Sequence, residues 1–331
     1  MAKYIIKRIL LAILILFGVS IVIYSLVRLM PVNYITDKFA AAVQNGDISQ
    51  EEVDRMLEIY GLADNSFLGI CKGYFMWIGN VLKGDLGNSF KYVDKVENVI
   101  FQNMGISFGI AFVALILEFI IAIPLGVKAA TNQYGVVDYT ATVLSMIGTA
   151  LPTFFFAAIC IQLFSVQLGW FPVNNLQSTL PIDASPWTVF WDKMWHLVLP
   201  IFIMVFLSVG SLMRYTRTNT LEVLNTDYIR TARAKGLGEG RVIYKHAFRN
   251  TLIPLVTLLA GTIPGLFSGA MITEQIFAIP GVGLKAYDAL KAGDIPFIMG
   301  YNMFLAILTV LGTLFADLLY AVVDPRVKIT K

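Results

Sequence analysis

The chain is poor in cysteine, histidine and charge, and each shortage excludes a class of protein. Two cysteines cannot form the disulfide framework of a small secreted domain, and Cys71 and Cys160 fall in different predicted segments. His196 and His246 stand fifty residues apart, so they predict neither a histidine metal cluster nor a histidine-based catalytic pair. Hydrogen-bonded structural histidines are the better interpretation.

A phosphate-binding loop of the Gly-x-x-x-x-Gly-Lys-Ser/Thr type is also absent from the sequence. The nearest glycine cluster, Gly281-Val282-Gly283, lacks the Gly-Lys pair that such a loop requires. We therefore expect no enzyme activity in this chain alone, no cofactor or metal of its own, and no independent ATP hydrolysis. The net charge of +3 is a poor argument for nucleic acid binding, because the basic residues follow the predicted membrane topology.

Hydrophobic residues make up 57% of the chain and charged residues only 14%, which is more apolar surface than one soluble core can hide. Six apolar runs are close to or above the ~20 residues that cross the hydrocarbon of a bilayer. The prediction is an all-α integral membrane protein with six transmembrane helices. The runs are Ile9–Val27, Val99–Leu117, Tyr139–Ile182, Leu197–Met213, Asn250–Thr273 and Ile295–Ala316.

The alternation of apolar and polar segments predicts three parts. Residues 1–30 form the first transmembrane helix, retained as an anchor because no cleavage pattern of small residues follows it. Residues 31–98 form a long outer insertion, and residues 99–331 form a five-span core with a cytoplasmic loop at 217–250. Fifteen of the 25 Lys and Arg residues fall on the side of the N-terminus, which predicts that both termini and this loop are cytoplasmic.

Two further local patterns make specific predictions. In the insertion, Ser49 and Glu52 have the spacing of a capping box at a helix start. After the third span, the segment Gln167–Trp195 is rich in proline and tryptophan, which favours an irregular segment at the outer membrane interface.

The polar segment 225–241, between the fourth and fifth predicted spans, predicts a short cationic helix. Asn225 or Thr226 can accept a hydrogen bond from a free amide of the first turn, and Gly236 can adopt the left-handed conformation that ends a helix. Asp227–Lys235 covers nine residues, or ~13 Å, and an isolated helix of that length is marginal in water. We therefore expect it to need a docking groove on another protein.

Glu118 is the clearest ionisable residue within a predicted span. A charge at the bilayer centre costs about 2.5 to 3.5 kcal/mol on insertion scales, so we expect Glu118 to face the helix bundle or a watery path. A structural hydrogen bond to a neighbouring helix and contact with a translocating solute are both open. Glu274 and Asp317, near span ends, are interpreted as interface or helix-packing groups.

An ordered series of motifs resembles the permeases of binding-protein-dependent ABC importers, and most closely the first permease of oligopeptide and dipeptide importers. Asp227–Leu237 followed by His246–Pro254 resembles their coupling loop. The chain has Arg230-Thr231-Ala232 where the broad importer signature has Glu-Ala-Ala, a variation that peptide-type permeases share. The resemblance also covers Arg28–Pro31, Gly84–Phe90, Ile123–Gly126, Leu168–Pro172, Ile279–Gly283, Asp317–Tyr320 and Asp324–Arg326.

The resemblance implies a type I ABC importer permease that forms half of the translocation pathway for oligopeptides or dipeptides. A permease for nickel or another small solute, and a stand-alone ion-coupled transporter, are the alternatives. The implied partners are a second homologous permease in a heterodimer, two ATP-binding subunits that hold ATP and Mg, and an extracytoplasmic peptide-binding protein, all at the lipid bilayer of a bacterial cell membrane. Glu118 is a candidate for the translocation path.

The same resemblance assigns contact with the ATP-binding subunit to the short cationic helix. Small Ala232 and Ala234 would permit close approach, and Arg233 and Lys235 would meet acidic or carbonyl groups in a groove. The residues implied in this coupling are Asp227, Arg230, Thr231, Ala232, Arg233, Ala234, Lys235, Gly236 and Leu237.

Overall fold

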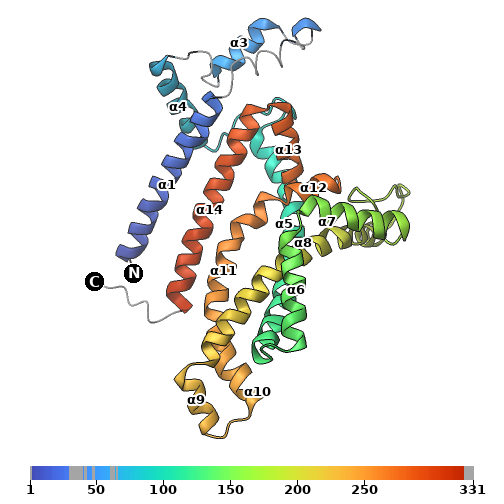
Figure 1. Ribbon diagram of the computed structural model, residues 1–331. Coiled ribbons are helices and arrows are strands. Elements are labelled where there is room, and N and C mark those ends of the chain that lie inside the picture. The colour runs from blue at the N-terminus through green and yellow to red at the C-terminus, as the bar shows by residue number, and fades with distance from the viewer. Residues whose placement is uncertain are drawn as a thin grey trace.

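The computed structural model describes residues 2–29, 40, 43–46, 49–59, 64 and 66–323, and these residues are predominantly helical. Figure 1 shows α1, α14 and α11 side by side, with α5, α6 and α8 beyond them. The long helices of this arrangement are α1 (Ala2–Leu29), α5 (Val96–Thr131), α8 (Pro186–Leu224), α11 (Phe248–Ser268) and α14 (Ile295–Val323). The prediction of an all-α membrane protein is confirmed.

Four helices within the described ranges are long and apolar enough to cross a membrane, or up to five if one bent pair counts as a span. The pair consists of α6 (Val136–Ala150) and the stretch Thr153–Gln167, which contains α7 (Thr153–Cys160) and the π-helical η1 (Ile161–Gln167). The chain bends by 106° between its two halves. The predicted count of six spans and the division at residues 30 and 98 stay predictions.

Helices α5, α6 and α8 cross with very little side chain between them. A Cβ atom on Gly126 of α5 would lie 2.7 Å from the carbonyl oxygen of Met213, and one on Gly210 of α8 would lie 2.6 Å from the Cβ atom of Ser145. Any larger residue would therefore push the helices apart, which explains why glycine stands at these two crossings.

The prediction that Gln167–Trp195 is irregular is wrong for its second half. Helix α8 begins at Pro186, and the N-cap Ser185 accepts a hydrogen bond from the Thr188 amide at 3.2 Å. Serine at the cap followed by proline at the first helical position is a helix-start signal that the analysis of composition alone overlooked. The tryptophans at 187, 191 and 195 therefore lie on the exposed surface of a helix.

The segment 31–98, predicted as an outer insertion, contains α3 (Gln50–Ile59) and α4 (Phe67–Val81). The capping box is confirmed: the Ser49 amide donates to the Glu52 carboxylate at 3.0 Å, and the Glu52 amide donates to the Ser49 hydroxyl at 3.2 Å. Helix α4 packs its buried Tyr74 and Trp77 against α1 and α14. Pro31 and Asp324–Arg326, which carried part of the family resemblance, lie outside the described residues.

Two buried carboxylates organise the end of the molecule that contains α12 (Met271–Ile276) and α13 (Val282–Ala292), above the middle of Figure 1. Glu274 is 1% exposed and accepts hydrogen bonds from the Ser107 hydroxyl at 2.7 Å and from the amides of Ala270 and Leu284 at 3.0 and 2.9 Å. The interpretation of Glu274 as a helix-packing group is confirmed. The side chain of Asp317 is not among those described.

The second buried carboxylate, Asp294, attaches the Gly84–Phe90 segment to α14. It accepts hydrogen bonds from the Ser89 hydroxyl at 2.5 Å and from the Lys91 and Phe297 amides at 3.1 and 3.2 Å. Burial raises the pKa of the neighbouring Tyr92 well above its ordinary value, so its hydroxyl stays protonated and donates to the Lys285 carbonyl at 2.9 Å.

Candidate functional site at the loop between α8 and α11

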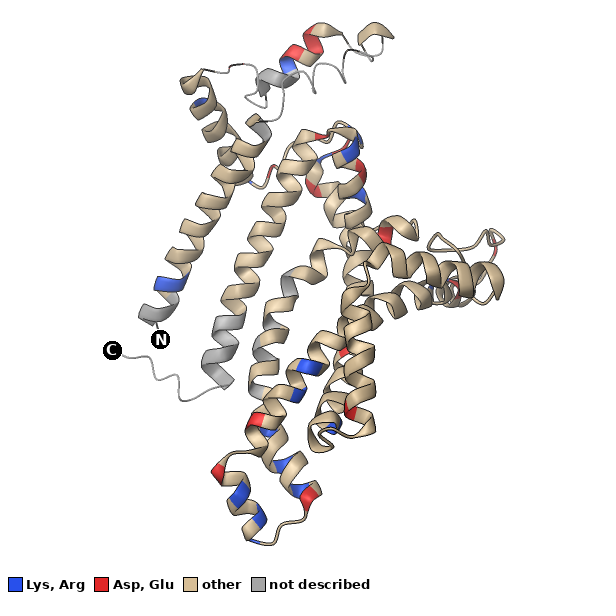
Figure 2. Ribbon diagram, viewed as in Figure 1, with Lys and Arg blue, Asp and Glu red and all other residues tan. Residues whose placement is uncertain are grey.

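The loop between α8 and α11 forms a helical hairpin at one end of the molecule, the lower end of Figure 1. It contains α9 (Asp227–Ala234), α10 (Glu239–Arg241) and the π-helical η2 (Val242–Ala247), which leads into α11. Figure 2 shows that Lys and Arg residues gather at this end. The predicted short cationic helix is confirmed, with its last helical residue at Ala234.

One face of α9 packs against its own chain. Ile229 is fully buried and Ala232 is 7% exposed, and they form an apolar cluster with Val242 and Ala247 of η2. The side chains of Val223, Leu224 and Leu237 pack at its edge. This cluster supplies the tertiary packing that a helix of eight residues needs. The methyl group of Ala232 is therefore used within the chain, whereas Ala234 is exposed.

The opposite face of α9 is exposed and mixes charge with one aromatic ring. Asp227, Arg230, Thr231 and Lys235 lie there, so four of the nine predicted coupling residues share one surface. Tyr228 is 44% exposed on the same face, and the sequence analysis missed it. Residues three positions apart share a face of a helix, so Tyr228 lies on the same face as Thr231. Adjacent residues do not share a face, so Tyr228 lies away from the buried Ile229.

The two ends of α9 differ in how well the sequence predicted them. Thr226 is the N-cap residue, but its hydroxyl donates to the Val223 carbonyl at 2.6 Å instead of accepting from the first turn. The Asn225 amide group donates to the Leu221 carbonyl at 3.0 Å, so the predicted capping hydrogen bond is wrong for both residues. Gly236 has φ of +74°, as predicted for the residue that ends the helix.

An ion pair closes the turn after α9. The Arg233 guanidinium donates to both carboxylate oxygens of Glu239, at 2.8 and 3.3 Å, across the turn that contains Gly236. Arg233 therefore holds the loop in shape, a role that the sequence analysis had not assigned. The Arg230 guanidinium and the Asp227 carboxylate form another, largely exposed pair, with 3.5 Å between nitrogen and oxygen. Lys235 takes part in none of the ion pairs found among the described residues.

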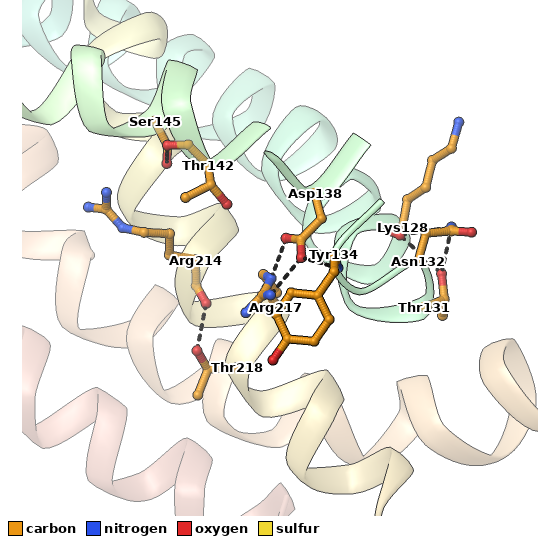
Figure 3. A network of polar contacts seen from close by, with 10 residues as sticks. All are labelled: Lys128, Thr131, Asn132, Tyr134, Asp138, Thr142, Ser145, Arg214, Arg217 and Thr218. Atoms are coloured by element: carbon orange, nitrogen blue, oxygen red, sulfur yellow. Dashed lines mark hydrogen bonds and ion pairs between the residues drawn. The ribbon is translucent and has the colours of Figure 1, made fainter. Parts of the chain in front are cut away.

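A second ion pair ties α8 to the first turn of α6 (Figure 3). Arg217 donates to the two carboxylate oxygens of Asp138 at 2.6 and 2.7 Å, and the Tyr134 amide donates to the same carboxylate at 2.9 Å. Asp138 is only 4% exposed. Because α8 continues directly toward α9, this pair joins the loop end of α8 to a neighbouring hairpin. The partners are 79 residues apart, so no local pattern could reveal it.

Glu118 lies on α5 with a half-buried side chain that faces the Ser208 hydroxyl of α8. Its orientation toward another helix agrees with the expectation from membrane energetics. The structure brings it near none of the α9 residues, which lie at the end of α8. Contact between Glu118 and a solute stays a prediction.

Comparison with known proteins gives the family. The family model described as "Binding-protein-dependent transport system inner membrane component" matches residues 122–329, more than half of the chain. The chain belongs to this family. Membership makes it an inner membrane component of a transport system and disfavours a stand-alone ion-coupled transporter.

Similar proteins match over essentially their whole length. The oligopeptide transport system permease protein AppB of Bacillus subtilis (strain 168) is 39% identical over 99% of this chain and 100% of that protein. The dipeptide transport system permease protein DppB of Alkalihalophilus pseudofirmus is 32% identical over 99% of this chain and 100% of that protein. A putative peptide permease protein of Brucella suis biovar 1 is 32% identical over the full length of both chains.

Proposed function

We propose that this chain is the permease subunit of an ATP-driven importer and forms half of a membrane pathway for oligopeptides or dipeptides. The observation that carries the proposal is the hairpin containing α9, whose inner face is fixed to its own chain while its outer face presents Tyr228, Thr231 and Lys235. The peptide substrate is supported by the names of the full-length relatives in three organisms.

The proposed division of labour follows from what the sequence lacks. Because it has no phosphate-binding loop, ATP and Mg would be held by two separate ATP-binding subunits, one of which would dock on α9. A second, homologous permease would complete the pathway, and an extracytoplasmic binding protein would deliver the peptide. The concentration of basic residues at the α9 end supports its assignment to the cytoplasmic side, together with both termini.

The contacts of α9 suggest how movement would pass into the membrane. Closure of the ATP-binding subunits would push on the exposed face of α9, and the Ile229 cluster would carry the displacement to η2 and the end of α8. The Arg217–Asp138 pair would extend it to α6. Exchange between inward and outward access is then a rigid-body movement driven by contacts that differ between the two states.

The turn after α9 provides a matched test. In Gly236→Val, a β-branched residue would have to adopt φ near +74°, at a cost of roughly 1 to 2 kcal/mol, although the space around it is open. Gly240→Val is the control, since a Cβ there also meets open space and no left-handed backbone is needed. With the complex reconstituted in vesicles, we expect Gly236→Val to lose peptide uptake and stimulation of ATPase activity, and Gly240→Val to retain both. Equal activity in the two variants would remove the turn from the mechanism.

Docking itself can be tested by copurification. Ala234 is exposed on α9, so Ala234→Arg adds bulk and charge to the proposed contact without disturbing the buried cluster. We expect this variant to lose the ATP-binding subunits during purification while keeping the second permease. Retention of the ATP-binding subunits at the wild-type level would contradict the assignment of this face.

The substrate class needs a separate measurement, because the resemblance also covers carriers of nickel and other small solutes. We expect the binding protein that works with this permease to retain oligopeptides or dipeptides when it is purified and its ligands are identified by mass spectrometry. Retention of a nickel chelate would replace the peptide assignment and leave the coupling mechanism intact.

A further inference from the structure

The turn at residues 89–94, which leads into α5, carries a strained and exposed side chain. The Ser89 amide donates to the Asp94 carbonyl at 2.9 Å, and the residues on either side of the turn pair as an antiparallel bridge. Within the turn, the Val93 amide donates to the Ser89 carbonyl at 3.2 Å, and Val93 has φ of +51°. The turn is therefore a short hairpin loop with one left-handed residue, and we call it the Val93 turn.

Valine is an unusual residue at this position. Four described residues other than glycine have positive φ, and Val93 is the one among them with a β-branched side chain. Hairpin loops that need one left-handed residue favour glycine there, because a side chain crowds the following carbonyl oxygen. The backbone of the turn therefore disfavours the residue that the sequence places in it.

Packing within the chain does not explain the valine either. Val93 is 89% exposed, so its side chain buries very little surface against the described residues. An apolar side chain stabilises a protein through the surface that it removes from water, and this one removes almost none. The conformational strain of Val93 is therefore not offset within the described part of the chain.

The Val93 turn lies in water rather than in the hydrocarbon of the bilayer. Four charged residues flank Val93 in the sequence, namely Lys91, Asp94, Lys95 and Glu97. The stretch 98–117 of α5, which contains no Lys, Arg, Asp or Glu, begins after them and covers about 30 Å, the thickness of the hydrocarbon layer. Contact with lipid tails therefore does not account for the exposed valine.

The turn is held firmly by two neighbouring helices. The Ser89 hydroxyl and the Lys91 amide donate to the buried carboxylate of Asp294, which directly precedes α14. The Tyr92 ring meets the Phe297 ring of α14 edge-on, with 5.6 Å between centroids, and its hydroxyl donates to a carbonyl of α13. A turn fixed in this way loses little conformational freedom when a partner binds it.

The charges beside Val93 are already compensated. The Lys91 ammonium lies 3.7 Å from the Asp288 carboxylate, and the Lys95 ammonium lies 3.8 Å from the Glu97 carboxylate. An apolar side chain with paired polar neighbours is typical of an interface hot spot, in which the apolar group fills a pocket and the polar groups form a rim. The turn therefore fits a protein surface with a small apolar pocket better than a strongly charged one.

We propose that Val93 is a contact residue for the extracytoplasmic binding protein, which would enclose its side chain in an apolar pocket. Two observations favour this partner. The family of the chain is described as binding-protein-dependent, and the helices that hold the turn, α13 and the start of α14, lie at the end of the molecule opposite α9 (Figure 1). The inference rests on the proposed function for placing this end outside the cell. Burial of Val93 in the complex would then offset its strain.

The affinity of the purified binding protein for the complex tests the proposal. The complex, with both permeases and the ATP-binding subunits, is held in lipid nanodiscs, and the dissociation constant is measured by surface plasmon resonance. Asparagine tolerates left-handed backbone, so Val93→Asn keeps the turn and removes the apolar group. We expect its dissociation constant to rise about tenfold, which corresponds to about 1.4 kcal/mol and to the lower end of the range for burying one valine.

Two further variants separate side-chain chemistry from backbone shape and position. Val93→Thr has the same branched shape and replaces a methyl group with a hydroxyl, so it should also weaken binding, by a smaller factor. Val136→Asn is the control, because Val136 is 82% exposed but begins α6, near the loop end of α8. This control should bind as the wild type does.

The thermal unfolding midpoint shows whether the valine serves the chain itself. We expect Val93→Asn and Val93→Gly to have midpoints equal to or above that of the wild type, because both residues accept positive φ more readily. A lower midpoint in both would show that Val93 stabilises its own chain, and would overturn the proposal.

The remaining outcomes separate this inference from the proposed function. Equal dissociation constants for the wild type, Val93→Asn and Val93→Thr would overturn the inference, even if the wild type imports peptide and the proposed function stands. Loss of the second permease from Val93→Asn during purification would identify a permease interface and also overturn it. A wild type that imports no peptide would contradict the proposed function, whereas weaker binding by Val93→Asn would still support this contact. A wild-type complex that does not bind the binding protein would contradict both.

Discussion

The loop end of the molecule and the end around Glu274 are stabilised by different kinds of interaction. At the loop end, α9 is held by one small apolar cluster and by ion pairs with exposed partners, such as Arg233 with Glu239. Around Glu274 and Asp294, carboxylates that are 1% exposed accept hydrogen bonds from several backbone amides and hydroxyls.

The comparison teaches which end can be displaced at low cost. Exposed ion pairs contribute little and re-form easily, and a surface helix fixed by few apolar contacts can be held or moved by a partner. A buried carboxylate with three donors can be separated from them only at a large cost, because each donor then loses its partner. We therefore expect the Glu274 end to stay rigid while α9 follows its partner.

Removal of the Glu274 carboxylate should have the largest effect. In Glu274→Ala, the Ser107 hydroxyl and two amides lose their acceptor and a cavity remains, which should lower the free energy of unfolding by about 3 kcal/mol. The measurement is denaturant unfolding of the purified protein in detergent. Glu239→Ala is the control at the loop end, and a loss as large as that of Glu274→Ala would contradict the difference between the two ends.

A pair of glycines compares the two ends without removing any polar group. A Cβ on Gly281 would overlap the Glu274 carboxylate and the Ser107 hydroxyl, whereas a Cβ on Gly238, after α9, meets open space. Neither glycine has a positive φ, so only packing differs. We expect Gly281→Ala to cost about 1 to 3 kcal/mol and Gly238→Ala only a few tenths, measured as unfolding free energies. Similar values would show that the Glu274 region can expand.

The Arg233–Glu239 pair should contribute little to stability. A double-mutant cycle with Arg233→Gln and Glu239→Gln should give a coupling energy of no more than about 1 kcal/mol, because both side chains are substantially exposed. The unfolding free energies of the four proteins provide this value, and it should fall when salt is added. A coupling energy above about 2 kcal/mol that does not change with salt would contradict this prediction, because it would show that the pair behaves like the buried carboxylates Glu274 and Asp294.

The smallest effect should come from the titration of Glu52 at the start of α3. Hydrogen bonds from the Ser49 amide and hydroxyl lower the pKa of Glu52, so its contribution to the helix is complete above the ordinary glutamate value of about 4.3. It is lost as the pH falls through the lowered pKa. The hydrogen-exchange protection factors of residues 50–55, which correct for the intrinsic pH dependence of exchange, should fall in acid in the wild type. Glu52→Gln should show no such change, and an equal acid response in both would contradict the assignment.

Local patterns in the sequence predicted the features that depend on neighbouring residues. The capping box at Ser49 and the helix end at Gly236 each follow from residues within a few positions of one another. The start of α8 at Ser185 was readable by the same rule and was overlooked because the tryptophan content suggested an irregular segment.

Features that depend on distant residues could not be predicted. Glu274 meets Ser107 across 167 residues, and Asp138 meets Arg217 across 79, so the spacing of either pair carries no signal. The hydroxyl of Thr226 had two possible partners within one turn, and only the structure shows that it donates backward to Val223. A cap residue fixes where a helix starts more reliably than it fixes the hydrogen bond made there.

The glycine crossings of α5, α6 and α8 limit how these helices can move. Where Gly126 and Gly210 bring main chain close to a neighbouring helix, no deformable layer of side chains remains on which one helix could slide past another. A displacement of any one of these three helices therefore moves the other two with it, as one rigid block. The conformational change of a transport cycle would then depend on hinges outside this block, at the ends of its helices.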